Sequence, residues 1–314
     1  MIDVHVHMAA LPTADNGVRL SERMLKGPVL RFVARQMGIP MDDPPEANRR
    51  FLEILDGELA QSKAVEAAVL LPMDGVYGKD GLLDAARTDF YIPNDAVLAA
   101  VRGRPRLWPG ASINPNRRDA IEELERVAAA GAVLVKVLPN AQAFDPAEAR
   151  HRPFYRALAR LGLPLLSHIG YEFSLIGQDQ SVGEPNRLIP ALEEGAVVIA
   201  AHGCSQGLWA LEPHLKTMGE LAARFKNFYT DLSALTLPNR AGALLRLRRR
   251  PELFERFLFG TDFPLPCFAY PALAAGPGAY LAARKAGNRF DRQKAVLDGL
   301  GIECGADFRR IIGR

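Results

Sequence analysis

The stretch IDVHVH (2–7) places two imidazoles in what reads as the first buried strand of the chain. Residues two apart on a strand face the same side, so His5 and His7 are expected to point to one place. A polar ring that leaves water needs a hydrogen-bonding or metal partner, because burying it alone is costly. The rest of the sequence has to supply that partner.

IDVHVH is the first of several short apolar runs that are bounded by Gly, Pro and Asn. The eight runs are IDVHVH (2–7), AVEAAVLLP (64–72), RLWPGASIN (106–114), AVLVKVLP (132–139), LPLLSHIG (163–170), AVVIAAHG (196–203), FYTDLSAL (228–235) and FLFGTDFP (257–264). Runs of this kind are typical of strands that are buried on both faces of a parallel sheet.

Helix-like stretches separate these runs. NRRDAIEELERVAAAG (116–131) carries an apolar stripe and ends at a glycine, and residues 151–162 and 215–227 are patterned similarly. Strand and helix in repeated alternation predict an α/β protein with a single (β/α)8 TIM barrel over residues 1–314. A doubly wound open sheet is the competing architecture, but no glycine-rich phosphate-binding motif accompanies the runs.

Two insertions interrupt the repeat. Residues 8–63 follow the first strand and contain helix-like segments, and residues 171–195 form a long loop after the fifth strand. In a barrel, both insertions rise over the carboxyl-terminal face, where active sites are built. They predict either a lid over the substrate or a contact between two copies of the chain.

Composition limits the class of protein. The chain has 48% hydrophobic residues and a net charge of only +3, and no basic motif with interleaved aromatics suggests nucleic-acid binding. Its three cysteines lack CxxC spacing, and it shows neither a signal-peptide pattern nor a long apolar span. We expect a cytoplasmic protein with a small-molecule ligand, without nucleic-acid or membrane partners, and we leave homo-oligomerisation open.

The ends of the expected strands carry most of the titratable chemistry, including four of the six histidines. Carboxyl ends of parallel strands meet at one rim of a barrel, so these side chains are expected to converge. The set is His5, His7, Lys136, His168, His202 and Asp262.

Taken one at a time, several members of this set have ordinary structural interpretations. His168 fits a hydrogen-bonded core histidine, His202 a loop cap, and Asp262 a turn aspartate. Taken together, imidazoles and a carboxylate are the donors that Zn²⁺ and similar ions prefer. Such a metal lowers the pKa of a bound water, and a nearby base then accepts the water proton.

The ordered motifs IDVHVH, VKVLP, LLSHIG, IAAHG and LFGTDFP resemble the amidohydrolase superfamily, in particular the amidohydrolase-2 branch of metal-dependent TIM-barrel hydrolases. The resemblance spans nearly the whole chain. It implies His5, His7, His168 and Asp262 as ligands of one divalent metal, most simply zinc. It also implies that His202 acts near the metal as an acid–base or substrate-polarising residue, and that Asp262 accepts the water proton as well.

Lys136 has two interpretations under this resemblance. In binuclear relatives, a carboxylated lysine on the fourth strand bridges two metals, so a second metal is an alternative here. In many members of this branch, a lysine in a similar context stands beside a single metal, where its ammonium would bind an anionic substrate group. The single metal is the preferred expectation.

The resemblance also sets the expected activity. The leading expectation is a hydrolase that uses metal-activated water on an amide, lactone or ester bond. The first alternative is a non-oxidative decarboxylase of an aromatic or unsaturated acid, and the second is a catalytically silent, ligand-binding barrel.

Further residues receive weaker assignments. The second insertion offers Glu172, Gln178, Asn186 and Arg187 as substrate contacts, although a role in stabilising the next helix fits them equally well. Asp231, in the seventh run, is interpreted as a supporting rim residue. The remaining histidines, His151 and His214, match no motif and are expected at the surface.

Overall fold

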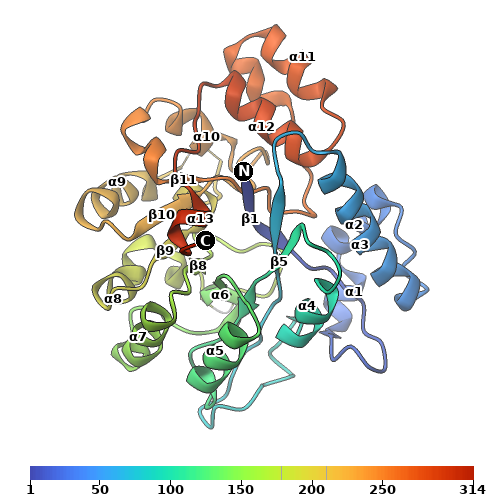
Figure 1. The fold of residues 1–314 in the computed structure, drawn as a ribbon, viewed down its shortest axis with the longest axis vertical. Coiled ribbons are helices and arrows are strands. Elements are labelled where there is room, and N and C mark those ends of the chain that lie inside the picture. The colour runs from blue at the N-terminus through green and yellow to red at the C-terminus, as the bar shows by residue number, and fades with distance from the viewer. Residues whose placement is uncertain (178, 210) are drawn as a thin grey trace.

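Parallel strands form the centre of the structure and follow one another around it in chain order (Figure 1). The computed structural model describes residues 1–177, 179–209 and 211–314. The strands are β1 (Ile2–His7), β3 (Ala67–Leu71), β5 (Leu107–Pro109), β6 (Ala111–Ser112), β7 (Val135–Val137), β8 (Leu165–Ser167), β9 (Val198–Ala200), β10 (Phe228–Asp231) and β11 (Phe257–Leu258). Since β5 and β6 are halves of one run, each of the eight predicted runs contains strand residues.

Hydrogen bonds join the last strand to the first. The Asp262 amide donates to the His5 carbonyl at 2.9 Å, and the His7 amide donates to the Phe263 carbonyl at 2.8 Å. On the opposite side, the segment that carries β5 and β6 connects the two parallel sheets, β1-β3-β5 and β11-β10-β9-β8-β7-β6. The fold is therefore the predicted TIM barrel and not an open sheet.

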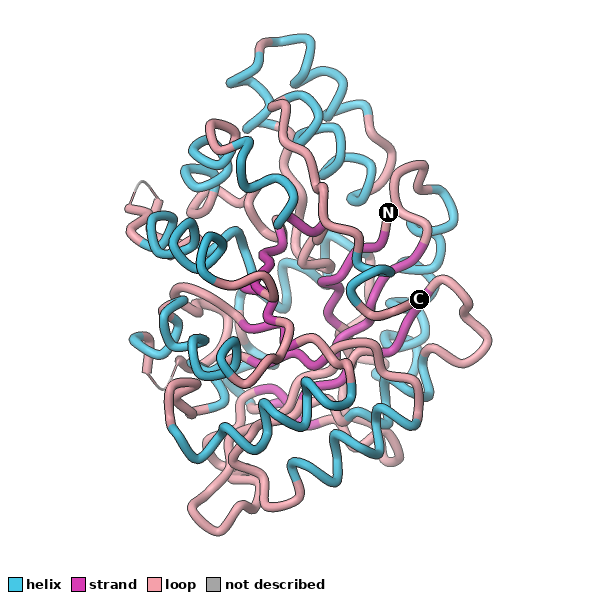
Figure 2. Tube along the Cα trace, turned by 60° about the vertical axis from the view of Figure 1, so that its left-hand side comes forward, coloured by secondary structure: helices cyan, strands magenta, loops and turns pink. Residues whose placement is uncertain are grey.

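Helices and loops surround this inner ring of strands (Figure 2). The helices are α1 (Glu22–Lys26), α2 (Pro28–Met37), α3 (Pro44–Gln61), α4 (Asn94–Ala100), α5 (Ala120–Ala129), α6 (Pro139–Gln142), α7 (Arg152–Leu161), α8 (Ile189–Glu193), α9 (His214–Arg224), α10 (Ala241–Leu247), α11 (Pro277–Lys285), α12 (Arg289–Gly299) and α13 (Phe308–Ile311). Short 3₁₀ turns cover η1 (Ala149–His151), η2 (Ser181–Gly183), η3 (Pro185–Leu188), η4 (Ala201–Cys204), η5 (Pro251–Arg256) and η6 (Tyr270–Ala275). No helix in the described ranges has the length and apolar character needed to cross a bilayer.

The two insertions build different structures. Within residues 8–63, α3 buries Phe51, Leu55 and Leu59 against the core, as an ordinary barrel helix does. The inserted part proper is α1, α2 and the strand β2 (Arg19–Leu20), which pairs antiparallel with β4 (Phe90–Tyr91). Residues 171–195 form a loop with two 3₁₀ turns that leads into α8.

Alternate strand residues belong to two separate apolar clusters. Val69, Leu166 and Leu258 share one cluster with Phe308 of α13. Their sequence neighbours, such as Leu70 and Leu165, join the larger cluster that includes the surrounding helices. The first cluster therefore fills the barrel, and in the view of Figure 1 α13 lies over the centre of the barrel.

His151 does not lie at the surface, contrary to the expectation. Its side chain is buried, and its ring meets that of Phe144 edge-on with centroids 5.6 Å apart. The turn η1 positions the ring immediately before α7, so the side chain fills a gap that sequence periodicity does not reveal. His214 is half-buried.

Candidate active site

An irregularity in β1 determines where the two histidines of IDVHVH point. Ile2 and Asp3 pair with Ala67 and Ala68, but Val6 and His7 pair with Leu70 and Leu71, so two residues of β1 oppose one residue of β3. Such a bulge lets two consecutive side chains, here Val4 and His5, face the same way. Val4 packs in the cluster inside the barrel, and His5 points to the rim together with His7.

Three of the predicted ligands form a compact cluster. His5 Nε2 lies 3.2 Å from His7 Nε2, and Asp262 Oδ1 lies 3.5 Å from the first and 3.4 Å from the second. Ligand bonds of roughly 2.1 Å in a tetrahedral site give donor–donor distances of about 3.4 Å. The spacing of these donors therefore fits one divalent metal.

The outer nitrogen of His5 is held by a carboxylate. His5 Nδ1 donates to Asp231 Oδ2 at 2.8 Å, and Ser233 Oγ lies 2.9 Å from the same nitrogen. Although burial alone would raise it, the neighbouring His5 and the hydrogen bonds hold the pKa of Asp231 at about 2. An ionised Asp231 fixes the proton on Nδ1 and leaves Nε2 unprotonated, as a metal ligand must be.

A chain of hydrogen bonds also fixes His168. His202 Nδ1 lies 3.2 Å from the Ser233 carbonyl, which can only accept, so Nδ1 carries the proton and Nε2 is an acceptor. His168 Nδ1 donates to that Nε2 at 3.1 Å. His168 Nε2 is then a buried, unprotonated nitrogen with no hydrogen-bond partner among the described residues, as an unfilled ligand position requires.

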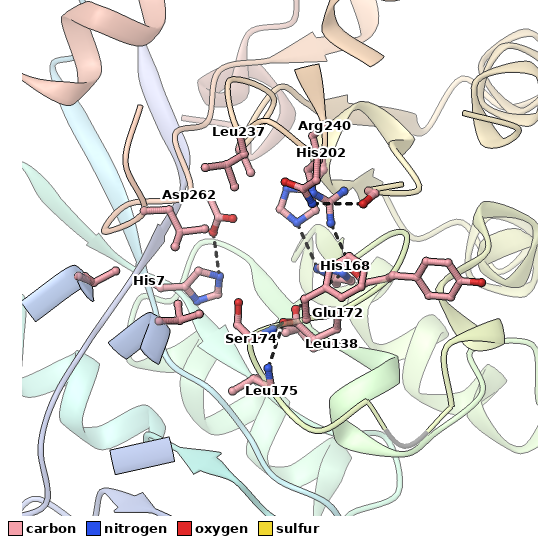
Figure 3. Close-up of a pocket in the computed structure, with 18 of the residues that line it drawn as sticks. His7, Leu138, His168, Glu172, Ser174, Leu175, His202, Leu237, Arg240 and Asp262 are labelled. Carbon is pink, nitrogen blue, oxygen red and sulfur yellow. Dashed lines mark hydrogen bonds and ion pairs between the residues drawn. The ribbon is translucent and has the colours of Figure 1, made fainter. Parts of the chain in front are cut away.

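His168 lies apart from the other predicted ligands. The donor atoms of His5, His7 and Asp262 lie within 4.8 Å of one another, those of His5, His202 and Asp231 form a second such cluster, and no cluster among the described residues includes His168. Figure 3 shows His7 with Asp262 on one side of the pocket and His168 with His202 on the other. Burial, followed by nearby positive charge, holds the pKa of His168 and of His202 well below the usual range, so both rings are neutral at neutral pH.

Lys136 lies at the inner edge of the first group. Its Nζ is 3.0 Å from His5 Nε2, and the side chain is fully buried. Burial lowers its pKa to about 8, while Asp231 and Asp262 counteract this effect. The side chain does not border the adjoining cavity.

Backbone geometry aims two of the site residues. His202 has φ 61° and Asp262 has φ 64°, a left-handed conformation that non-glycine residues seldom adopt. Asp3 accepts from the Thr261 hydroxyl at 2.6 Å and from the His5 amide at 2.9 Å. These bonds connect β1 to the segment that contains Asp262, and they help to maintain the unfavourable backbone conformation of Asp262.

A cavity of about 640 Å³ opens directly above these residues. It is lined by His7, His168, His202 and Asp262, by Arg240, and by apolar side chains from the insertions. The buried Arg240 guanidinium donates to the Ser205 carbonyl at 2.9 Å and to the Tyr171 carbonyl at 3.3 Å. Among the described residues, no carboxylate lies within ion-pair distance of this guanidinium.

The residues proposed from the second insertion have different positions. Glu172 lines the cavity, and its carboxylate lies 3.8 Å from His168 Nε2. Arg187 lies outside the cavity lining and donates to Asp145 at 2.6 Å, and Asn186 is exposed. Gln178 falls outside the described residues.

Two residues of the site, Ser233 and Arg240, are not among those predicted from the sequence. Ser233 lies in the same run as Asp231, two residues away, so the period of a strand was an available signal. Arg240 follows β10 in a loop with no motif, and nothing in the sequence distinguishes it from the other arginines.

Comparisons with known proteins agree with this architecture. An uncharacterized TIM-barrel protein from Bordetella bronchiseptica is 20% identical, with 100% of this chain and 99% of that one covered and a TM-score of 0.62. A probable 2-pyrone-4,6-dicarboxylic acid hydrolase from Acinetobacter baumannii, solved with citric acid, is 15% identical over 100% and 99% of the chains, with a TM-score of 0.58. 5-Carboxyvanillate decarboxylase from Sphingomonas paucimobilis is 14% identical over 99% and 98%, with a TM-score of 0.51.

At these identities the solved structures establish the fold alone. No curated protein sequence matches the chain. The sequence model of a family described as amidohydrolase, in its second branch, matches residues 2–284. This chain therefore belongs to the amidohydrolase-2 family.

Proposed function

We propose that the protein is a metal-dependent hydrolase that cleaves an amide, lactone or ester bond of a small molecule. The observation that carries this proposal is the cluster of His5, His7 and Asp262, whose donor atoms are 3.2–3.5 Å apart at the inner end of a cavity. Such donors at a barrel rim are poorly placed to stabilise the fold and well placed to meet a ligand.

The residues divide the chemistry as follows. His5, His7 and Asp262 would hold the metal, and the fourth donor we propose is His168 Nε2, which has no hydrogen-bond partner among the described residues but lies outside that cluster. A divalent ion in this place, most simply zinc, supplies Lewis acidity toward a carbonyl oxygen and a water. Asp262 would accept the water proton, and His202, kept neutral by burial and by Arg240, would orient His168, whose Nδ1 donates to His202 Nε2.

Metal number depends on Lys136. We propose one metal, with the Lys136 ammonium adding positive charge beneath the site for an anionic group. A carboxylated Lys136 would add an oxygen donor beside His5 Nε2, and the pair His168 and His202 would then hold a second ion. Metal content per chain distinguishes these arrangements.

The first test compares wild type with Asp262→Asn after reconstitution with Zn²⁺, Mn²⁺ or Fe²⁺. We expect about one metal per wild-type chain, weakened binding in the variant, and loss of activity on a panel of amides, esters and lactones. Asp145→Asn is the matched control, because Asp145 pairs with Arg187 outside the cavity and should leave both readouts unchanged. Full activity without metal, or in Asp262→Asn, would contradict the proposal.

A decarboxylase is the second candidate, and Arg240 is the observation that favours it. A buried guanidinium without a carboxylate partner is suited to the carboxylate of a substrate. Release of CO2 from substituted benzoates, lost in Asp262→Asn, would support this reaction over hydrolysis. If the metal-loaded protein turns over neither panel, the catalytically silent ligand-binding barrel is the remaining interpretation.

The cavity and the cysteines support proposals about the ligand and the cellular compartment. The cavity has the size of small-molecule sites in general. We therefore infer a small-molecule ligand, and we retain the cytoplasm as the predicted compartment because the three cysteines are free thiols.

A further inference from the structure

The walls of the active-site cavity are mostly apolar, and they come from the inserted segments. Helices α1 and α2 contribute Met24, Val29, Leu30 and Val33, and the loops after β8 and β9 contribute Phe173 and Trp209. The first insertion therefore functions as a wall of the cavity, which favours the lid interpretation over a contact between copies.

Five titratable side chains gather at the inner end. His7, His168, His202, Arg240 and Asp262 surround the inner end of the cavity, where Figure 3 shows them facing one another. The cavity is thus polar where the proposed reaction takes place and mostly apolar along its length. Such a division is complementary to a molecule with one polar end.

The mouth of the cavity exposes large apolar side chains from three separate segments. Val29 on α2 is 39% exposed, Phe173 is 60% exposed and Trp209 is 68% exposed, and all three line the cavity. Single exposed apolar residues are ordinary, but several at one opening mark a binding surface. This rim continues the apolar wall outward to solvent.

We propose that the substrate is amphiphilic, with its hydrolysable carbonyl at the polar inner end and an apolar chain along the wall formed by the insertions. This inference rests on the proposed function. It assigns chain-length specificity to α2 and to Phe173 and Trp209, none of which contacts the predicted metal ligands by a hydrogen bond among the described residues.

Binding can be measured without turnover. The chain has two tryptophans, and Trp108→Phe leaves Trp209 at the rim as the only one. Trp108 packs against the barrel-filling cluster with its ring under Arg309, and it does not line the cavity. Linear alkanoates from butanoate to decanoate, added below micellar concentrations to the zinc-loaded protein, should shift Trp209 emission to the blue.

Affinity should increase with chain length. Burying a methylene strengthens binding by up to about fourfold, so the series should span several hundredfold or more if the wall is used throughout. Dissociation constants that do not change with chain length would overturn the inference. So would a blue shift that follows protein concentration without ligand, since the rim would then be covered by a second copy.

Variants on one helix provide the matched comparison. Leu30→Asn and Val29→Asn place a polar amide on the cavity wall and should flatten the dependence on chain length. Phe32→Asn is the control, because Phe32 is 48% exposed on the same helix but lines a different cavity. Equal effects of all three variants would indicate helix destabilisation and would contradict the assignment.

Turnover of lactones with alkyl tails of increasing length separates the two proposals. Tight, length-dependent alkanoate binding without hydrolysis would retain the amphiphile site and reject the hydrolase. Hydrolysis with a kcat/KM that is independent of tail length would retain the hydrolase and reject the amphiphile. Growth of kcat/KM by up to about fourfold per methylene, lost in Leu30→Asn, is the expected outcome.

Discussion

At the scale of single residues, Asp231 is the side chain on which the metal site depends most without belonging to the predicted ligands. It accepts from His5 Nδ1 and also from the amides of His202 and Ser233. Asp231→Asn replaces the anion with an amide that can donate to Nδ1 and shift the His5 proton to Nε2. We expect a 10- to 100-fold loss of zinc affinity, roughly the usual effect of such partners, measured by chelator competition. Ser233→Ala, which keeps the Asp231 carboxylate, should lower zinc affinity less. Unchanged zinc affinity in Asp231→Asn would show that Asp231 does not position His5.

At the scale of elements, the loops after β8 and β9 approach so closely that one position has room only for glycine. Gly170 has φ +86°, and an added Cβ would lie 2.3 Å from the Ser205 carbonyl oxygen. Gly162, which ends α7, has φ +65° but open space around it. Gly162→Ala should therefore cost about 1 kcal/mol from backbone strain, and Gly170→Ala should cost about 1–3 kcal/mol more from the clash. Urea denaturation measures both, and equal costs would show that the loops relax freely.

At the scale of the whole molecule, buried His151 makes stability depend on pH. Burial lowers its pKa to about 4, against about 6.5 in an unfolded chain. Between these values the unfolded state binds a proton that the folded state does not, so stability falls as the pH drops from 6.5 to 4, by up to ~1.4 kcal/mol per pH unit. His151→Gln removes this dependence while other groups titrate as before. The urea midpoint should therefore fall less between pH 7 and pH 5 in the variant, and an identical fall would show that His151 already titrates normally.

The local sequence was sufficient to predict the barrel and the side chains that meet at its rim. Apolar runs buried on both faces, alternating with amphipathic helices, have few other arrangements, and each of the eight runs contains strand residues. The order of His5, His7, His168, His202 and Asp262 at strand ends followed from parallel topology alone, since parallel strands present their carboxyl ends at one rim. These features depend on residues near in sequence or on a repeat, so periodicity reveals them.

Only the tertiary structure decided the remaining features, because they arise from contacts between distant segments. The bulge that turns His5 toward the rim comes from the register of β1 against β3, and strict alternation gives no sign of it. The hydrogen-bond chain from Asp231 through Ser233 and His202 to His168 joins residues at the ends of three strands. Arg240 and the apolar wall of α2 reach the cavity only when loops fold over the barrel. The walls of the cavity are set by these long-range contacts, whereas the fold and the residues that meet at the rim are encoded in local pattern.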